Sequence, residues 1–146
     1  MNLWRISRFH DLDGLGTLKT FGRWHIVGSR MIYTTDSPAS ALLEICAHTT
    51  RQKVPASFTL LKILGLNTDV EEIQLSRMSP DWVNRIEVTQ ALGAEWLESQ
   101  RTALLRVPSA LVPETWNYLL NPLHPEAGKI RIERVYEYPF DLRLKR

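Results

Sequence analysis

The spacing of apolar and polar residues along the chain predicts a mixture of strands and helices. Residues 3–9 alternate imperfectly between apolar and polar side chains, and residues 31–35 are rich in β-branched and aromatic side chains, so both segments predict strands. Residues 57–66 form an almost continuous apolar run, which is typical of a buried strand. Further strands are expected at residues 71–75, 103–107 and 129–137.

A helix is expected directly after the second strand. Ser37 can serve as its N-cap, and Pro38 suits the first helical position. The residues that follow are good helix formers with apolar side chains on one side, and Glu44 and His48 lie one turn apart at the edge of that side. Later in the chain, a short helix is expected to open at residues 79–82, and another, capped by Thr89, is expected to run through Leu97.

The order of these elements favours an α+β domain with a mixed β-sheet core. Strands and helices follow one another without the regular βαβ rhythm of a doubly wound sheet. Residues 121–125 contain two prolines and are expected to form a rigid loop. The chain of 146 residues has the usual size of one domain and shows no repeat or linker, so we expect residues 1–146 to form a single domain.

Composition narrows the class of function. The net charge is only +2, a near-balance that argues against direct binding of nucleic acid. The single cysteine, Cys46, excludes an internal disulfide and suits a reducing compartment. Neither a signal-peptide pattern nor an apolar run of about 18 residues is present. We therefore expect a cytoplasmic protein that does not engage a membrane.

Common enzyme signatures are absent from the sequence. There is no P-loop, no GxGxxG, no HExxH and no GxSxG motif. Cys46 and His48 could contact a metal, but neither a CxxC motif nor a second histidine cluster supports such a site, so no metal is expected.

Two segments in the first third of the chain carry residues suited to ligand binding. Gly22 would let the backbone approach a ligand, Arg23 could grip an anion and Trp24 could line a pocket, although a surface loop with one anchoring Trp is the plainer interpretation. A strand–turn–helix unit could aim Tyr33 and Glu44 into one cleft, but Glu44 could equally face solvent.

Two later segments are comparable. Ser109 follows a proline at a strand break and could present its hydroxyl and backbone N–H to a ligand, or it could belong to a plain turn. Residues 117–125 form a proline-rich, polar segment that could line a pocket or merely end a helix. Each segment read alone is a weak indication of a site.

Taken in order, these segments resemble the RES family, which is named for an Arg, a Glu and a Ser. The resemblance covers nearly the whole chain, and several matches in the right order make it specific. Two departures adjoin the Arg segment: Phe21 stands where the family often has glycine, and His25 stands where it often has asparagine. The matching segments are residues 4–6, 22–24, 32–34, 41–44, 107–110, 117–125 and 140–143.

The resemblance assigns site residues position by position. It implies that Arg23, Glu44 and Ser109 are the family's catalytic Arg, Glu and Ser. Arg5 and Tyr33 match further pocket positions. Together the residues expected to bind NAD are Arg5, Arg23, Trp24, Tyr33, Ser109, Asn121 and His124.

The resemblance also implies a fold like that of bacterial ADP-ribosyltransferase toxins and a role as the toxin of a toxin–antitoxin pair. The expected reaction is cleavage of the nicotinamide–ribose bond of NAD by water or phosphate, with NAD as substrate and no cofactor. ADP-ribosylation of a host protein is the alternative, and a non-catalytic binding module or an RNase toxin is a weaker one. The expected partner is an Xre-type antitoxin, and either a homodimer or a toxin–antitoxin hetero-oligomer is left open.

The chemistry of NAD suggests a separate binding or catalytic role for each of these residues. Two guanidinium groups, from Arg5 and Arg23, would suit the pyrophosphate. Tyr33 or Trp24 could pack against nicotinamide or ribose. Glu44 would stabilise the positive charge that develops on the ribose as the bond breaks. Ser109 would hydrogen-bond the ribose or the nicotinamide amide rather than act as a covalent nucleophile, because no base is evident beside it.

Overall fold

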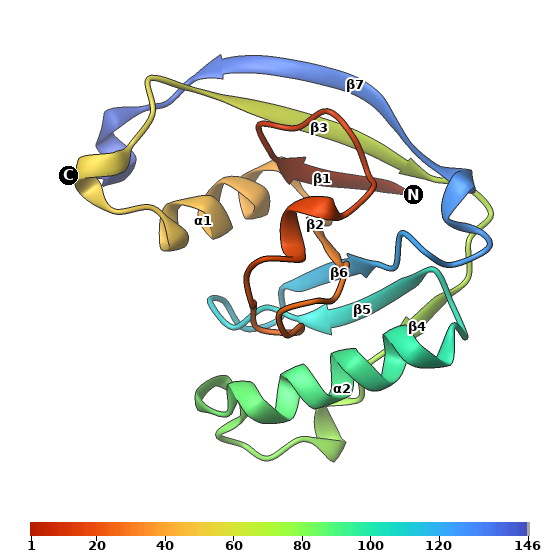
Figure 1. Cartoon of the computed structure of the whole chain (residues 1–146). Coiled ribbons are helices and arrows are strands. Elements are labelled where there is room, and N and C mark those ends of the chain that lie inside the picture. Colours follow the sequence, from red (N-terminus) through yellow and green to blue (C-terminus); the bar gives the residue numbers. More distant parts are fainter. Residues whose placement is uncertain (146) are drawn as a thin grey trace.

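A computed structural model describes residues 1–145. Over these residues seven strands form one sheet in the order β4-β5-β6-β2-β1-β3-β7 (Figure 1). Every neighbouring pair is antiparallel except β4 and β5, which run parallel, so the sheet is mixed as expected. The elements are β1 (Asn2–Ile6), β2 (Ile32–Thr35), α1 (Pro38–His48), β3 (Ser57–Gly65), β4 (Val70–Glu72), α2 (Ile86–Ser99), β5 (Leu104–Pro108), β6 (Trp116–Leu120) and β7 (Ile130–Pro139).

Two apolar clusters hold this sheet together. One includes Leu3, Leu61 and Leu104, which are fully buried. The other lies between α2 and the strands β5 and β6, where Trp96 packs with Leu105. In Figure 1, α2 runs alongside β4, β5 and β6, whereas α1 lies below the long β3–β7 ribbon. The two helices thus accompany different halves of the sheet.

Helix α1 begins as its local sequence predicts. The Ser37 side chain accepts a hydrogen bond from the backbone N–H of Ser40 at 3.1 Å, and Pro38 occupies the first helical position. Ala41 is buried against the sheet, and Glu44 follows one turn later on a partly buried side of the helix. The helix therefore starts where its sequence predicts, and its buried side places Glu44 toward the sheet.

The prediction that Thr89 caps a helix is wrong, because Thr89 lies inside α2. The helix already begins at Ile86, and the Thr89 hydroxyl donates to the carbonyl oxygen of Arg23 at 2.5 Å, so it fastens the helix to the loop before β2. Gly93 allows the same close approach, because a Cβ atom there would collide with the Trp24 carbonyl oxygen. Tertiary packing thus uses two residues that look unfavourable for a helix.

The strand boundaries differ from the prediction at two places. The first strand ends at Ile6 rather than at residue 9. The strand expected at residues 71–75 ends at Glu72, and residues 75–77 form a short 3-10 helix instead. Strand β6 was not expected, because its five residues stand between proline-rich segments. It pairs with β5 on one side and β2 on the other, so it lies inside the sheet.

Candidate functional site

A cavity opens where strands β1 and β2 diverge. These neighbours share a single register pair, Trp4 with Thr35, and beyond it the sheet opens. Helix α1 lies beside both strands. The resulting cavity of about 220 Å³ is lined by residues of β1, β2 and α1 and by Asn117 of β6. The fold therefore brings side chains from four elements to one small space.

Glu44 presents its carboxylate to this cavity. Its side chain is 28% exposed. Oε1 accepts a hydrogen bond from Asn117 Nδ2 at 2.9 Å and lies 3.4 Å from the Ser109 hydroxyl. Oε2 lies 4.0 Å from His48 Nε2, one helical turn away. The alternative that Glu44 simply faces solvent is therefore wrong, because its carboxylate contacts Asn117 of β6 and Ser109, the residue that follows β5.

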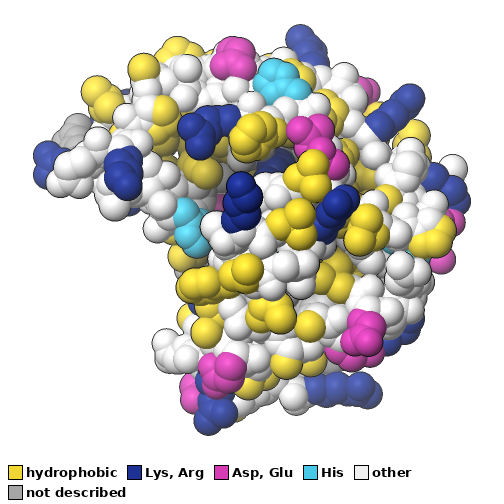
Figure 2. All heavy atoms as spheres, in the orientation of Figure 1, with side chains coloured by type: hydrophobic (Ala, Val, Ile, Leu, Met, Phe, Trp, Pro, Cys, Tyr) yellow, Lys and Arg dark blue, Asp and Glu magenta, His cyan; other side chains and the backbone are white. Residues whose placement is uncertain are grey.

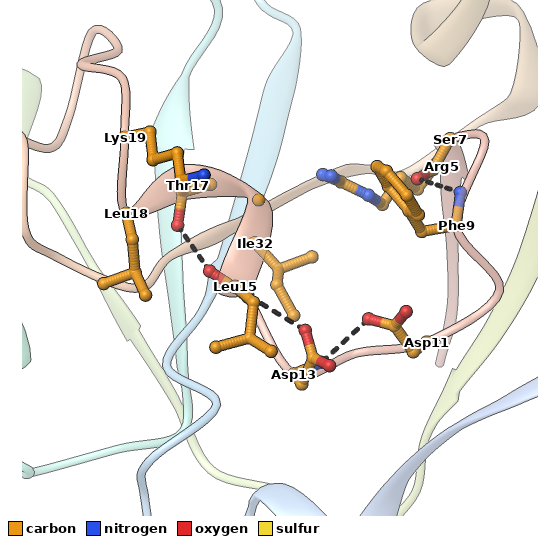
Figure 3. Close-up of a pocket in the computed structure, with 12 residues that line it drawn as sticks. Arg5, Ser7, Phe9, Asp11, Asp13, Leu15, Thr17, Leu18, Lys19 and Ile32 are labelled. Atoms are coloured by element: carbon orange, nitrogen blue, oxygen red, sulfur yellow. Dashed lines mark hydrogen bonds between the residues drawn. The ribbon is translucent and has the colours of Figure 1, made fainter.

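Arg5 connects this cavity with a second, larger one. The second cavity, of about 530 Å³, lies under the loop after β1 and is lined by Phe9, Leu15 and Lys19 among others (Figure 3). Arg5 lines both cavities and donates through Nη1 to the carbonyl oxygen of Tyr33 at 3.0 Å. Burial lowers the pKa of the Arg5 guanidinium, and nearby Asp11 opposes that effect. An arginine remains cationic under such conditions.

The Tyr33 hydroxyl anchors the loop before β2. It accepts a hydrogen bond from the Trp24 backbone N–H at 3.0 Å and lies 2.7 Å from His25 Nδ1. The His25 Nε2 atom lies 3.1 Å from the Thr20 carbonyl oxygen, so Nε2 donates and Nδ1 accepts from Tyr33. Burial lowers the pKa of His25 and raises that of Tyr33 to about 12, which keeps both groups neutral.

This network also explains the glycine of the Arg segment. A Cβ atom at Gly22 would lie 2.6 Å from the Tyr33 hydroxyl and 2.8 Å from the His25 ring. Residue 22 must therefore lack a side chain for the hydrogen bonds of Tyr33 and His25 to form. The hydroxyl of Tyr33 is committed to the loop, while the residue as a whole still lines the Glu44 cavity.

Arg23 and Trp24 lie beside this network rather than in the cavity. Arg23 donates through Nη1 to the Val83 carbonyl oxygen at 2.9 Å, and its guanidinium stands 5.7 Å from the centre of the Trp82 ring. Trp24 is 2% exposed and packs in the core with Trp96. Neither is among the residues that line the Glu44 cavity, so their direct contact with NAD stays a prediction.

Asn121 and His124 lie at a different end of the molecule. The Asn121 Oδ1 atom accepts from the Leu123 N–H at 3.0 Å, and His124 Nε2 donates to the Gln100 carbonyl oxygen at 2.9 Å. Both residues are buried and tie the rigid loop to the end of α2. The structure thus brings together Arg5, Tyr33, Glu44 and Ser109 but places Asn121 and His124 elsewhere.

Two cavity residues were not anticipated as site residues. Asn117 lies within a segment of the family resemblance, and His48 was noted only as a helical neighbour of Glu44. The pairing of Thr35 with Asn117 across β2 and β6 is what places the asparagine at the cavity. Within residues 1–145, no three His, Cys, Asp or Glu side chains gather to hold a metal, and no helix is long and apolar enough to cross a membrane.

Comparison with known proteins identifies the family. A family model described as RES domain matches residues 2–142. The chain belongs to the RES domain family. It is 40% identical over 146 residues to a protein of Pseudomonas putida named Toxin Res, covering 99% of each chain. It is 33% identical to a protein of a Sphingobium species named Prs ADP-ribosylating toxin, covering 99% of this chain and 97% of the relative.

A solved structure shares the fold of this RES-domain chain. It is the crystal structure of the M. tuberculosis MbcT-MbcA toxin-antitoxin complex, with a TM-score of 0.78 and 15% identity, covering 94% of this chain and 84% of the other. The expected α+β fold with a mixed β-sheet core is confirmed.

Figure 2 shows Lys and Arg side chains gathered around a hollow on one face of this domain.

Proposed function

We propose that this RES-domain protein is the toxin of a toxin–antitoxin pair and that it cleaves the nicotinamide–ribose bond of NAD. The observation that carries the proposal is the partly buried Glu44 carboxylate in a cavity that also contains Arg5. Breaking the bond develops positive charge on the ribose, and a preorganised carboxylate stabilises that charge as it forms. The names of the relatives, which include an ADP-ribosylating toxin, support the same chemistry.

Arg5 suits the pyrophosphate of NAD. One of its N–H groups is used by the Tyr33 carbonyl oxygen, and a guanidinium has five, so donors remain for phosphate oxygens. Because Arg5 lines both cavities, NAD would place its nicotinamide ribose beside Glu44 and extend past Arg5 into the larger cavity. NAD is then the substrate, and the reaction requires no separate cofactor.

The acceptor of the ADP-ribosyl group distinguishes the possible activities. Water gives NAD hydrolysis, phosphate gives phosphorolysis, and a protein side chain gives ADP-ribosylation. We place the small-molecule acceptors first, because the cavity beside Glu44 measures only about 220 Å³. Protein ADP-ribosylation is the second candidate, because one relative is named for it.

The test is to incubate the purified protein with NAD labelled in the adenine ring. We expect free nicotinamide in every case, with the label in ADP-ribose, in ADP-ribose phosphate or attached to protein of a host extract according to the acceptor. Glu44→Gln keeps the size and the acceptor atom for Asn117 but loses the charge, and should lower turnover about 10²–10³-fold. Absence of nicotinamide release, or normal turnover by folded Glu44→Gln, would overturn the proposal.

The antitoxin partner can be tested separately in cells. A cytoplasmic enzyme that consumes NAD harms its host, so expression of this protein alone should stop growth. Co-expression of an Xre-type antitoxin from the same locus should restore growth, whereas Glu44→Gln should be harmless without it. A toxin-antitoxin complex as the structural neighbour supports this pairing.

A further inference from the structure

The carboxylate of Glu44 has two unlike oxygens. Oε1 is held by Asn117 Nδ2 at 2.9 Å and lies 3.4 Å from the Ser109 hydroxyl. Among residues 1–145 no side chain donates a hydrogen bond to Oε2, which lies 4.0 Å from the exposed His48 ring. We propose that Asn117 is a positioning residue that, with Ser109, holds Oε1 and thereby presents Oε2 to the ribose of NAD. The inference rests on the proposed function of Glu44.

Asn117 is placed rigidly enough to orient another side chain. It pairs with Thr35 of β2 on one side and with Val107 of β5 on the other, so its backbone is fixed by two strands. Glu44 instead stands on a helix, on a long side chain whose rotamers must be restricted before it can act. A fixed donor supplies this restriction before substrate binds, which is what preorganisation requires.

The orientation of the Asn117 amide follows from this contact. A carboxylate oxygen only accepts hydrogen bonds, so the amide nitrogen must face Glu44. The Asn117 Oδ1 atom is buried and has no hydrogen-bond partner among residues 1–145. An unpartnered buried acceptor is costly, so packing stability alone does not explain an asparagine at this position. Its contact with Glu44 does.

Ser109 contributes from the end of the neighbouring strand. Its hydroxyl oxygen accepts from the Leu111 N–H at 3.1 Å, which leaves the hydroxyl hydrogen for Oε1 of Glu44. Ser109 is 7% exposed, so it is better placed to hold Glu44 than to bind a ligand directly. Two donors, one in β6 and one directly after β5, therefore converge on the same carboxylate oxygen.

A double-mutant cycle tests the proposal. Asn117→Leu should lower kcat about tenfold or more while KM for NAD changes less than about threefold, because the loss is one of transition-state stabilisation. In a Glu44→Gln background the same exchange should lower kcat little further, because residues that act as a unit are not additive. Asn2→Asp, on an exposed strand position away from the cavity, is the control and should change neither constant.

A second arm measures thermal unfolding and needs no NAD. Asn117→Asp sets two carboxylates against each other across a 2.9 Å contact and should lower Tm by several degrees. In the Glu44→Gln background the loss should disappear, because the amide that replaces the Glu44 carboxylate can donate to the new carboxylate. Asn2→Asp again serves as the matched control, and Asn117→Ser replaces Asn117→Leu if the latter does not fold.

The outcomes separate the two proposals. Costs of Asn117→Leu and Glu44→Gln that multiply, or a raised KM with unchanged kcat, would overturn the positioning role. An equal loss of Tm from Asn117→Asp in both backgrounds would overturn the contact itself. Normal turnover by Glu44→Gln would instead refute the proposed function, while the thermal cycle would still report on the contact.

Discussion

Replacing Tyr33 by Phe tests whether the hydroxyl of this residue anchors the loop before β2. The exchange removes one oxygen atom and leaves two groups without a partner, the Trp24 N–H and His25 Nδ1. Both residues are almost fully buried, at 2% and 3% exposure. A buried polar group left unpaired costs about 1–3 kcal/mol, so the loss of partners for two groups should lower the free energy of unfolding by about 2–6 kcal/mol. That is a large part of the roughly 5–15 kcal/mol typical of a domain.

Urea unfolding followed by tryptophan fluorescence would measure this loss. Tyr138→Phe is the matched control, because that side chain is 64% exposed and should lose less than about 0.5 kcal/mol. The denaturant slope m should be unchanged, which would confirm that the folded and unfolded states are otherwise the same. If Tyr33→Phe and Tyr138→Phe lose equally little, the loop does not depend on the Tyr33 hydroxyl and the network is not structural.

Three further predictions concern the same region. Burial lowers the pKa of His25 from 6.5, so the unfolded chain binds its proton first and the free energy of unfolding should fall as pH drops below about 6.5; His25→Asn, which keeps an acceptor, should flatten that fall, and equal pH profiles would contradict the assignment. Gly22→Ala should lose about 1–3 kcal/mol in urea unfolding through its clash with Tyr33, whereas Gly128→Ala, with no neighbour within 4 Å, should lose little. Arg5→Lys should raise KM for NAD roughly tenfold, because an ammonium cannot match the guanidinium fork; an unchanged KM would show that Arg5 does not bind the pyrophosphate.

Helix α1 could be predicted from the sequence because its signals are local. Ser37 and Pro38 are start signals that act within one turn, and they function in the structure as in isolated helices. The rotation of the helix then follows from its apolar side. What could not be predicted is the surface that this side would meet, because β1 and β2 diverge only in the folded sheet.

Strand β6 and its asparagine could not be predicted for a related reason. Five residues between proline-rich segments give a short pattern that a turn explains as well. Their strand conformation comes from pairing with β5 and β2, which are distant in sequence or separated by a long loop. Only this pairing brings Asn117 to Glu44, which lies 73 positions earlier in the chain.

The order of residues along a family motif predicts which segments meet, but not which atom faces the ligand. The Tyr33 hydroxyl suits a substrate chemically, yet it already donates its proton to His25 Nδ1 and accepts from the Trp24 N–H. Arg23 and Arg5 each donate one N–H to a backbone carbonyl oxygen, so both keep donors for a pyrophosphate; what separates them is that Arg5 lines the cavity beside Glu44 and Arg23 does not. The Tyr33 hydroxyl is decided by its hydrogen bonds, because a donor already used inside the protein is one that substrate cannot use, whereas the arginines are decided by their positions. In the proposed reaction, Glu44 Oε2 and the remaining N–H groups of Arg5, which line the same cavity, are therefore the polar atoms best placed to act on NAD.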